Sequence, residues 1–172
     1  GRYHTVGLKS DGTLWTWGDN YSGQLGDGTN TDKRTPLTQE STGTTNWSAI
    51  AAGYDHTVGL KSDGTIQAWG SNSHGQLGDG TTIDRATPIQ ESTGATNWSA
   101  ITTGRYHTVG LKSDGTLWAW GDNTYGQLGD GISISRSAPT QIGVDTWSAI
   151  AAGAYHTVAL RSNGTLWAWG NN

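Results

Sequence analysis

The chain contains no cysteine, and only 14% of its 172 residues are charged. The absence of cysteine excludes disulfides, thiol chemistry and cysteine-based zinc sites. No apolar run approaches the roughly 20 residues that span a membrane, and no signal peptide is visible. The formal net charge is −4, and only Lys33 and Arg34 are adjacent among the ten Lys and Arg residues. A nucleic-acid partner is not expected, because phosphate binding needs a basic face.

Glycine and tryptophan are abundant, with 27 and 10 residues, although hydrophobic residues make up only 33% of the chain. Low charge with many Gly and Trp residues indicates a turn-rich all-β protein whose core is carried by a few large rings. Disorder requires high charge and few aromatic residues, so the composition argues against it. The length suits one domain of ordinary size, which we place at residues 1–172.

One phrase, His-Thr-Val-Gly-Leu-Lys-Ser-Asp-Gly-Thr-Leu-Trp, recurs with small variations from His4, His56, His107 and His156. These histidines are 52, 51 and 49 residues apart. A period near fifty residues predicts a propeller or a stacked array. The repeats are approximately residues 1–46, 47–97, 98–146 and 147–172, or about 3.4 periods. Because the chain begins and stops inside a repeat, we expect it to be a piece of a longer chain.

Length varies in only one part of each repeat. Each histidine precedes the last Gly of Leu-Gly-Asp-Gly by 24 residues, whereas that Gly precedes the next Trp-Ser-Ala-Ile by 19, 18 or 16 residues. Surface connections tolerate such changes and packed strands do not. The segments 29–46, 81–97 and 132–146 are therefore predicted to be solvated connections, with a second binding surface as the alternative.

The unit at residues 47–96 predicts four short strands. Residues 47–52 form a small apolar run, and residues 56–60 alternate, with His56, Val58 and Leu60 on one face. Asp63-Gly64 predicts a hairpin with a type I′ turn, which residues 65–70 follow as the return strand. Pro88 suits an edge strand around residues 85–91. Four strands per fifty residues predict a propeller blade.

The complete chain is predicted to hold three, four, four and three strands, or fourteen. Two such chains would carry as many strands as seven four-stranded blades. Half of a longer chain and a dimeric ring therefore both remain open. The first and last blades each lack a strand, and an unpaired edge invites another chain.

One tryptophan of the return strand recurs in every repeat, and these residues are expected in the structural core: Trp17, Trp69, Trp120 and Trp169. Burying one Trp removes roughly 150–250 Å² of surface from water. Two residues earlier, Gln67 stands where the other repeats have tryptophan, so we expect that position to be partly exposed.

The order of these motifs resembles the regulator of chromosome condensation repeat family. The most specific elements are the Gly-Gln-Leu-Gly segments at residues 23–26, 75–78 and 126–129. The resemblance covers nearly the whole chain and implies a seven-bladed β-propeller, here of bacterial type. It also implies binding of a protein partner through one propeller face, because members with different functions share that property.

The recurring histidines His4, His56, His107 and His156 are expected to be structural, each hydrogen-bonded within its own blade. A metal site on the propeller axis is the alternative. His74 lies in a turn and is expected to be exposed. Asp27, Asp79 and Asp130 fit turn chemistry better than calcium binding, because their spacing matches no calcium loop. We find no phosphate loop and no catalytic grouping, so no enzyme activity, cofactor or metal is predicted.

Just before each His-Thr, equivalent positions differ between the repeats. The resemblance places them in loops on one face near the central opening. Tyr and Arg are common anchors of interfaces. We therefore predict that the partner-binding residues are Arg2, Tyr3, Tyr54, Asp55, Arg105, Tyr106 and Tyr155. The alternative is that these are ordinary exposed loop residues.

The sequence thus predicts a non-catalytic protein-binding or scaffold module whose partner is a protein of unknown identity. One alternative is a structural repeat unit of a cell-surface or filamentous assembly that self-associates through open blade edges. The other is a regulator similar to a guanine-nucleotide exchange factor. An extracellular or cell-surface location is expected.

Overall fold

Fourteen short strands make up the regular structure of the chain. The computed structural model describes the backbone of residues 1–172 and every side chain except those at positions 35 and 36. The strands are β1 (His4–Leu8), β2 (Leu14–Gly18), β3 (Lys33–Gln39), β4 (Trp47–Ala52), β5 (His56–Lys61), β6 (Ile66–Gly70), β7 (Arg85–Gln90), β8 (Trp98–Thr103), β9 (His107–Lys112), β10 (Leu117–Gly121), β11 (Arg136–Gln141), β12 (Trp147–Ala152), β13 (His156–Arg161) and β14 (Leu166–Gly170).

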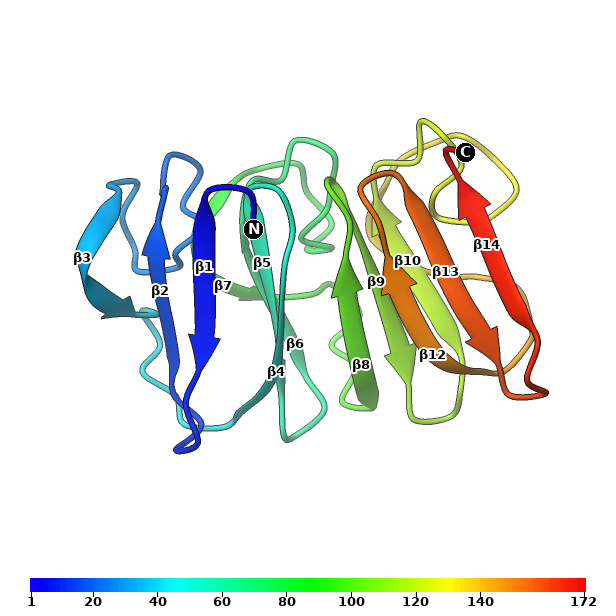
Figure 1. Ribbon diagram of the computed structural model, residues 1–172, viewed down its shortest axis with the longest axis horizontal. Coiled ribbons are helices and arrows are strands. Elements are labelled where there is room, and N and C mark those ends of the chain that lie inside the picture. Colours follow the sequence, from blue (N-terminus) through cyan, green and yellow to red (C-terminus); the bar gives the residue numbers. More distant parts are fainter.

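The strands form four antiparallel sheets that follow one another across the molecule (Figure 1). Sheet 1 is β1-β2-β3, sheet 2 is β4-β5-β6-β7, sheet 3 is β8-β9-β10-β11, and sheet 4 is β12-β13-β14. The predicted count of three, four, four and three strands is confirmed. The all-β prediction is confirmed as well, since the described residues contain no helix.

Each sheet is a meander in which hydrophobic alternation sets the register. In sheet 2, Val58 pairs with Ala68 and Leu60 pairs with Ile66, and all four side chains are buried. A slip by one residue would turn these side chains to the opposite face. The proline-containing strand β7 lies at the outer edge, as its missing N–H predicts.

The Asp-Gly hairpins differ in turn type from the prediction. The N–H of Gly64 donates to the carbonyl of Lys61 at 3.0 Å, so Ser62 and Asp63 are the central residues of the turn. Gly64 alone has a positive φ, of 78°, whereas a type I′ turn would need positive φ at Asp63 also. The predicted type I′ turn is therefore wrong, and each hairpin has a three-residue loop that ends in a left-handed glycine.

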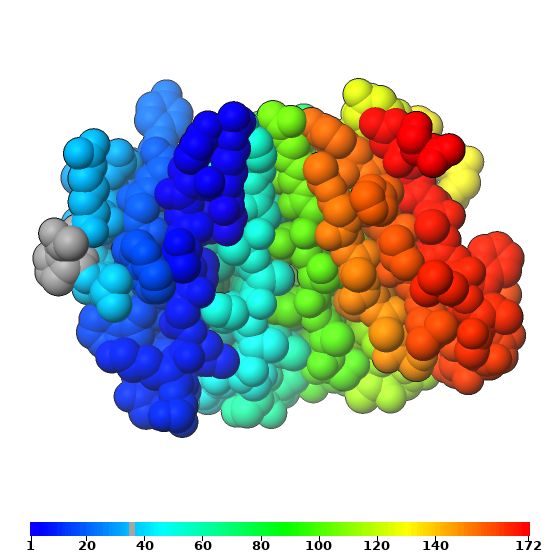
Figure 2. All heavy atoms as spheres, in the orientation of Figure 1, coloured from blue at the N-terminus to red at the C-terminus, as the bar shows by residue number. Residues whose placement is uncertain are grey.

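The core lies between consecutive sheets rather than inside any one of them. The strand β8 contacts both β4 and β12, and sheets 2 and 3 are covered on both faces. In Figure 2 the colours run from blue to red across the molecule, so consecutive parts of the chain lie side by side. Trp69 and Trp120 are fully buried, whereas Trp17 and Trp169 at the two ends are half-buried. Gln67 is half-buried, and so are Trp15 and Trp118 at the equivalent position.

The segments predicted to be solvated connections, 29–46, 81–97 and 132–146, each contain the outer strand that is expected from the sequence, with exposed residues on either side of it. Their exposed apolar residues include Ile83 and Ile134, which are 61% and 63% exposed. These segments are therefore partly built into the sheets rather than simple links.

Candidate functional site

The histidines join consecutive sheets. The Nε2 of His4 lies 2.9 Å from the Oγ1 of Thr57 in sheet 2. That hydroxyl donates to the carbonyl of Gln24 at 2.8 Å, and the Nε1 of Trp69 donates to the same carbonyl at 3.0 Å. The expectation of a hydrogen bond within one blade is therefore wrong, because the partner of the histidine comes from the next blade.

We call this His–Thr–carbonyl set of hydrogen bonds between two sheets a joint. The same joint recurs at the two other contacts between sheets. His56 and His107 each lie 3.2 Å from the hydroxyl of a threonine in the following sheet. Those threonines donate to the carbonyls of Gln76 and Gln127, both at 2.7 Å. The glutamine carbonyl of each Gly-Gln-Leu-Gly motif is therefore the acceptor that ties one sheet to the next.

Burial keeps these histidines neutral. Desolvation lowers the pKa of His4 and of His56 to about 3, and that of His107 to about 4. A neutral imidazole can bond the threonine hydroxyl without carrying a charge into the core. Among the residues that the structure describes, no three His, Cys, Asp or Glu side chains gather in a metal-binding arrangement.

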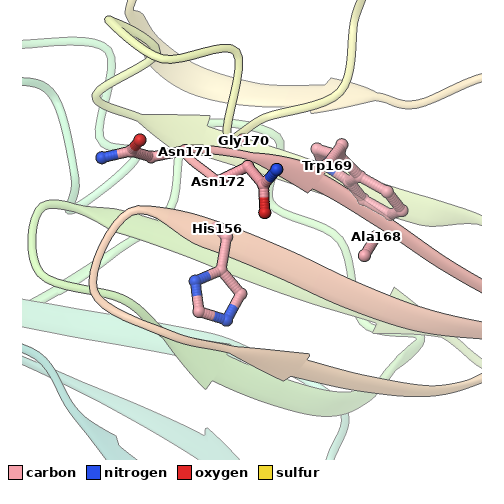
Figure 3. A pocket seen from close by; sticks show the side chains of 6 residues that line it. All are labelled: His156, Ala168, Trp169, Gly170, Asn171 and Asn172. Carbon is pink, nitrogen blue, oxygen red and sulfur yellow. The ribbon is translucent and has the colours of Figure 1, made fainter.

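The fourth histidine of the set, His156, is exposed. It lines a cavity of about 420 Å³ with the end of β14 and the last two residues (Figure 3). In the other three sheets the following sheet covers this surface. Accordingly, Leu166 is 70% exposed whereas its equivalents Leu14 and Leu117 are fully buried. The cavity is therefore the uncovered face of sheet 4 and not a pocket shaped by the fold.

The aspartates of Leu-Gly-Asp-Gly are bound within their own loops. Asp79 accepts from the side chain of Asn72 at 3.1 Å and pairs with Arg85 at 2.7 Å. It also accepts the backbone N–H of Thr81 at 3.0 Å. Asp130 pairs with Arg136 at 3.0 Å in the same way. Their oxygens are occupied by protein donors, which agrees with turn chemistry.

The residues before each His-Thr meet on one face through a ladder of backbone hydrogen bonds. The N–H of Arg2 donates to the carbonyl of Tyr54 at 3.2 Å, and the N–H of Tyr54 donates to the carbonyl of Arg105 at 3.2 Å. The N–H of Arg105 donates to the carbonyl of Ala154 at 2.9 Å. Loops about fifty residues apart in sequence are thereby held side by side.

Cation–π contacts connect the side chains above this ladder. The guanidinium carbon of Arg2 lies 4.6 Å from the ring centroids of both Tyr3 and Tyr54. That of Arg105 lies 4.2 Å from Tyr54 and 5.0 Å from Tyr106, and its Nη1 donates to the hydroxyl of Tyr155. Contacts of this kind hold long side chains in place at the surface.

Side chains of the Gly-Gln-Leu-Gly loops add a rim that the sequence did not indicate. His74 stacks on Tyr106 with ring centroids 4.8 Å apart, and Tyr125 meets Tyr155 edge to face at 5.4 Å. His74 is half-buried, so the expectation that it is simply exposed is wrong. The only signal was that the turn position before Gly-Gln-Leu-Gly varies between repeats, with Ser22, His74 and Tyr125.

Asp55 is the acidic member of this face. Burial, followed by the nearby charge of Asp19, raises the pKa of its carboxyl group, and the guanidiniums of Arg2 and Arg105 oppose that rise. Neither arginine pairs with it closely enough to count as a salt bridge in the described part of the chain.

We name the group the Arg/Tyr face, and it consists of Arg2, Tyr3, Tyr54, Asp55, Arg105, Tyr106 and Tyr155. It borders a groove of about 360 Å³ whose remaining lining is small, namely residues 52–53, 103–104 and 152–154. The residues offer stacking surfaces, guanidinium donors and phenol hydroxyls. Such groups are common at binding surfaces.

The family model described as the regulator of chromosome condensation (RCC1) repeat matches residues 11–60, 63–111 and 114–160. The ultraviolet-B receptor UVR8 of Arabidopsis thaliana is 36% identical over 143 residues, which cover 83% of this chain and 32% of the receptor. The human E3 ubiquitin-protein ligase HERC2 is 33% identical over 141 residues, covering 81% of this chain but 3% of the ligase. The chain thus spans a third or less of these relatives.

Solved structures show the same fold. Yeast RCC1 (Prp20), in its complex with Kap60, superposes with a TM-score of 0.83 at 25% identity, covering 99% of this chain and 42% of that one. Human WBSCR16 superposes with a TM-score of 0.88 at 22% identity, covering 99% of this chain and 45% of that one. The four sheets are therefore blades of a β-propeller. No helix that could cross a membrane occurs in the described residues.

Proposed function

We propose that this chain, which belongs to the RCC1 repeat family, is a non-catalytic protein-binding module that uses its Arg/Tyr face. The observation that carries the proposal is the cluster of stacked Arg and Tyr side chains above the backbone ladder. The relatives support it, because yeast RCC1 was solved bound to Kap60, and its binding to Gsp1p and histones was studied.

The arrangement of the face favours binding because its side chains are already ordered. Arg105 contacts three tyrosine rings, and Tyr54 contacts both arginines. Ordering a flexible side chain on binding costs about 0.5–1.5 kcal/mol. A cluster that is fixed before the partner arrives avoids much of that cost. Tyr and Arg are also the residue types most often found as interface hot spots.

The test is replacement of Tyr3, Tyr54, Arg105 and Tyr106 by Ala, followed by a pull-down. We expect the variant to lose the partner that the native chain recovers. The matched control replaces Lys9, Asp11, Lys112 and Asp114 by Ala, because these residues lie at the opposite ends of β1 and β9. Unchanged recovery by the first variant contradicts the assignment to this face.

Self-association of this 172-residue chain through its open blade edges is the second candidate function. Leu166 and Trp167 are 70% and 46% exposed, and β14 has no strand on its outer edge. Light scattering coupled to size exclusion measures the mass of the 18.1 kDa chain. Concentration-dependent polymers support this candidate, and a strictly monomeric chain contradicts it.

A further inference from the structure

Among the described residues, two guanidiniums of the Arg/Tyr face form no salt bridge. Arg2 from sheet 1 and Arg105 from sheet 3 both lie over the ring of Tyr54 from sheet 2, at 4.6 and 4.2 Å. In the described part of the chain, no carboxylate comes within salt-bridge distance of either guanidinium. The ion pairs found there use other cations, namely Lys33, Arg85, Arg136 and Arg161.

The spacing of the two guanidiniums follows from the contacts. Because both lie over one ring, their central carbons are within about 9 Å of each other, a separation set by two cation–π contacts. The ladder gives a similar spacing, since backbones joined by such hydrogen bonds lie about 4.8 Å apart and Arg105 is two rungs from Arg2.

The groove beside the guanidiniums is shaped for a main chain. Apart from Arg2, Tyr54, Thr103 and Arg105, its lining is Gly and Ala at residues 52–53, 104 and 152–154, so a second backbone can approach closely over that part of the groove. In an extended segment, alternate side chains point to the same side about 7 Å apart. Carboxylates on alternate residues would therefore reach both guanidiniums.

We infer that Arg2 and Arg105 hold an extended acidic segment of the protein partner, with carboxylates on alternate residues. This inference rests on the function proposed above and names the chemistry of the partner. Arg pairs with carboxylates through two parallel hydrogen bonds, which gives geometric selectivity beyond charge. Asp55 is the acidic group that competes for the same guanidiniums. The net charge of −4 disfavours nonspecific binding of acidic peptides, so binding reports the local site.

The probe is a fluorescein-labelled peptide with Glu-Thr-Glu between Gly-Ser flanks, measured by fluorescence anisotropy on the 172-residue chain. We expect it to bind at least about tenfold more tightly than the same peptide with Gln-Thr-Gln. The double variant R2Q/R105Q is expected to reduce the affinity by about tenfold or more. The charge-matched control K9Q/K112Q is expected to change it less than about twofold. Asp55→Asn is expected to strengthen binding.

Equal binding of the Gln-Thr-Gln peptide by the native chain overturns the inference, and this comparison needs no variant to fold. Native affinity in R2Q/R105Q overturns it as well, once circular dichroism shows that the variant is folded. If the native chain is a dimer and the R2Q/R105Q variant is a monomer, the carboxylates that bind the two arginines belong to a second copy of this chain. That result also overturns the inference. If the variant with Tyr3, Tyr54, Arg105 and Tyr106 replaced by Ala loses its partner while the native chain binds both peptides equally, the proposed function stands and only the acidic segment is wrong.

Discussion

At the scale of single residues, the Gly-Gln-Leu-Gly motif is explained by what lies above its last glycine. Gly26 has a φ of 71°, and a Cβ there would lie 2.6 Å from the Nε1 of Trp69 in the next sheet. Gly78 and Gly129 meet Trp120 and Trp169 in the same way. The motif therefore serves packing between blades, and its glutamine contributes its backbone carbonyl to the joint.

Gly26→Ala should destabilise the chain because it combines a left-handed backbone with a clash against Trp69. Gly43 is a matched control, since its φ is 63° and a Cβ there meets nothing within 4 Å. We expect Gly43→Ala to cost about 1 kcal/mol and Gly26→Ala about 2 kcal/mol more, measured by chemical denaturation. Equal losses would show that Trp69 does not need the space above Gly26.

Trp69→Ala should lower the free energy of unfolding by about 3–5 kcal/mol, because the ring is fully buried and its removal leaves a cavity. Trp167→Ala is the control, since that ring is 46% exposed and its loss should cost about 1 kcal/mol or less. Denaturation midpoints with unchanged slopes give both values. A Trp69 variant as stable as the native chain would remove this residue from the core.

At the scale of strands and sheets, the contact between blades is a polar joint inside an apolar layer. One threonine hydroxyl links a histidine and a carbonyl of the preceding sheet. Each sheet therefore depends on its neighbour for hydrogen bonds as well as for apolar cover. Cooperative unfolding of neighbouring sheets follows from this dependence.

Thr57→Val should lower the free energy of unfolding by about 1–3 kcal/mol. The substitution leaves the buried Nε2 of His4 without its hydrogen-bond partner and removes the hydroxyl that donates to the carbonyl of Gln24. Thr5→Val is the matched control, since Thr5 occupies the same motif position in sheet 1 and is exposed. We expect it to change the free energy of unfolding by less than about 0.5 kcal/mol. Thermal denaturation of both variants gives the comparison, and equal effects would argue against the joint.

The third joint has lost a buried carboxylate that the other two retain. Glu40 and Glu91 are both 2% exposed and accept the indole N–H of Trp47 and of Trp98, each at 3.2 Å. Ile142 stands at the equivalent position, in the shorter loop before Trp147. The Nε1 of Trp147 is consequently buried with no partner among the described residues. The loop that varies in length in the sequence thus alters the inside of a joint.

At the scale of the whole molecule, the buried histidines make stability depend on pH. Their folded pKa values, about 3 to 4, lie below the ordinary value of 6.5, so the unfolded chain binds more protons in mild acid. The stability that they contribute is present above pH 6.5 and is lost as the pH falls toward 4. Between pH 7 and pH 5 we expect a loss of about 2 kcal/mol per histidine.

Urea denaturation at several pH values measures the slope of the free energy of unfolding against pH, which is proportional to the number of protons taken up on unfolding. His56→Gln should reduce the slope by about one proton near pH 5, because glutamine does not titrate. His74→Gln is the control, since His74 is half-buried at the surface rather than enclosed in a joint. A flat stability between pH 7 and pH 5 in the native chain would contradict neutral, buried histidines.

Much of the fold could be predicted from the sequence because its signals are local. The signals lie within single repeats: the Asp-Gly hairpins and the alternation at Val58 and Leu60 mark the strands, and the repeat period marks the length of each blade. The strand count was correct for that reason. The turn type was wrong because a three-residue loop needs a left-handed residue only at Gly64, and Asp63 stays in the ordinary region.

The sequence by itself determined the blades and their strands, and its resemblance to the repeat family pointed to the residues of the Arg/Tyr face. Only the tertiary structure decided what those residues contact, because each joint brings together groups about fifty residues apart. His4 contacts Thr57, and Arg105 contacts Tyr54, although about fifty residues separate the partners in each pair. A pattern of neighbouring residues does not predict such contacts. The sequence pattern inside each repeat specifies one blade, whereas these contacts depend on how one blade is placed against the next.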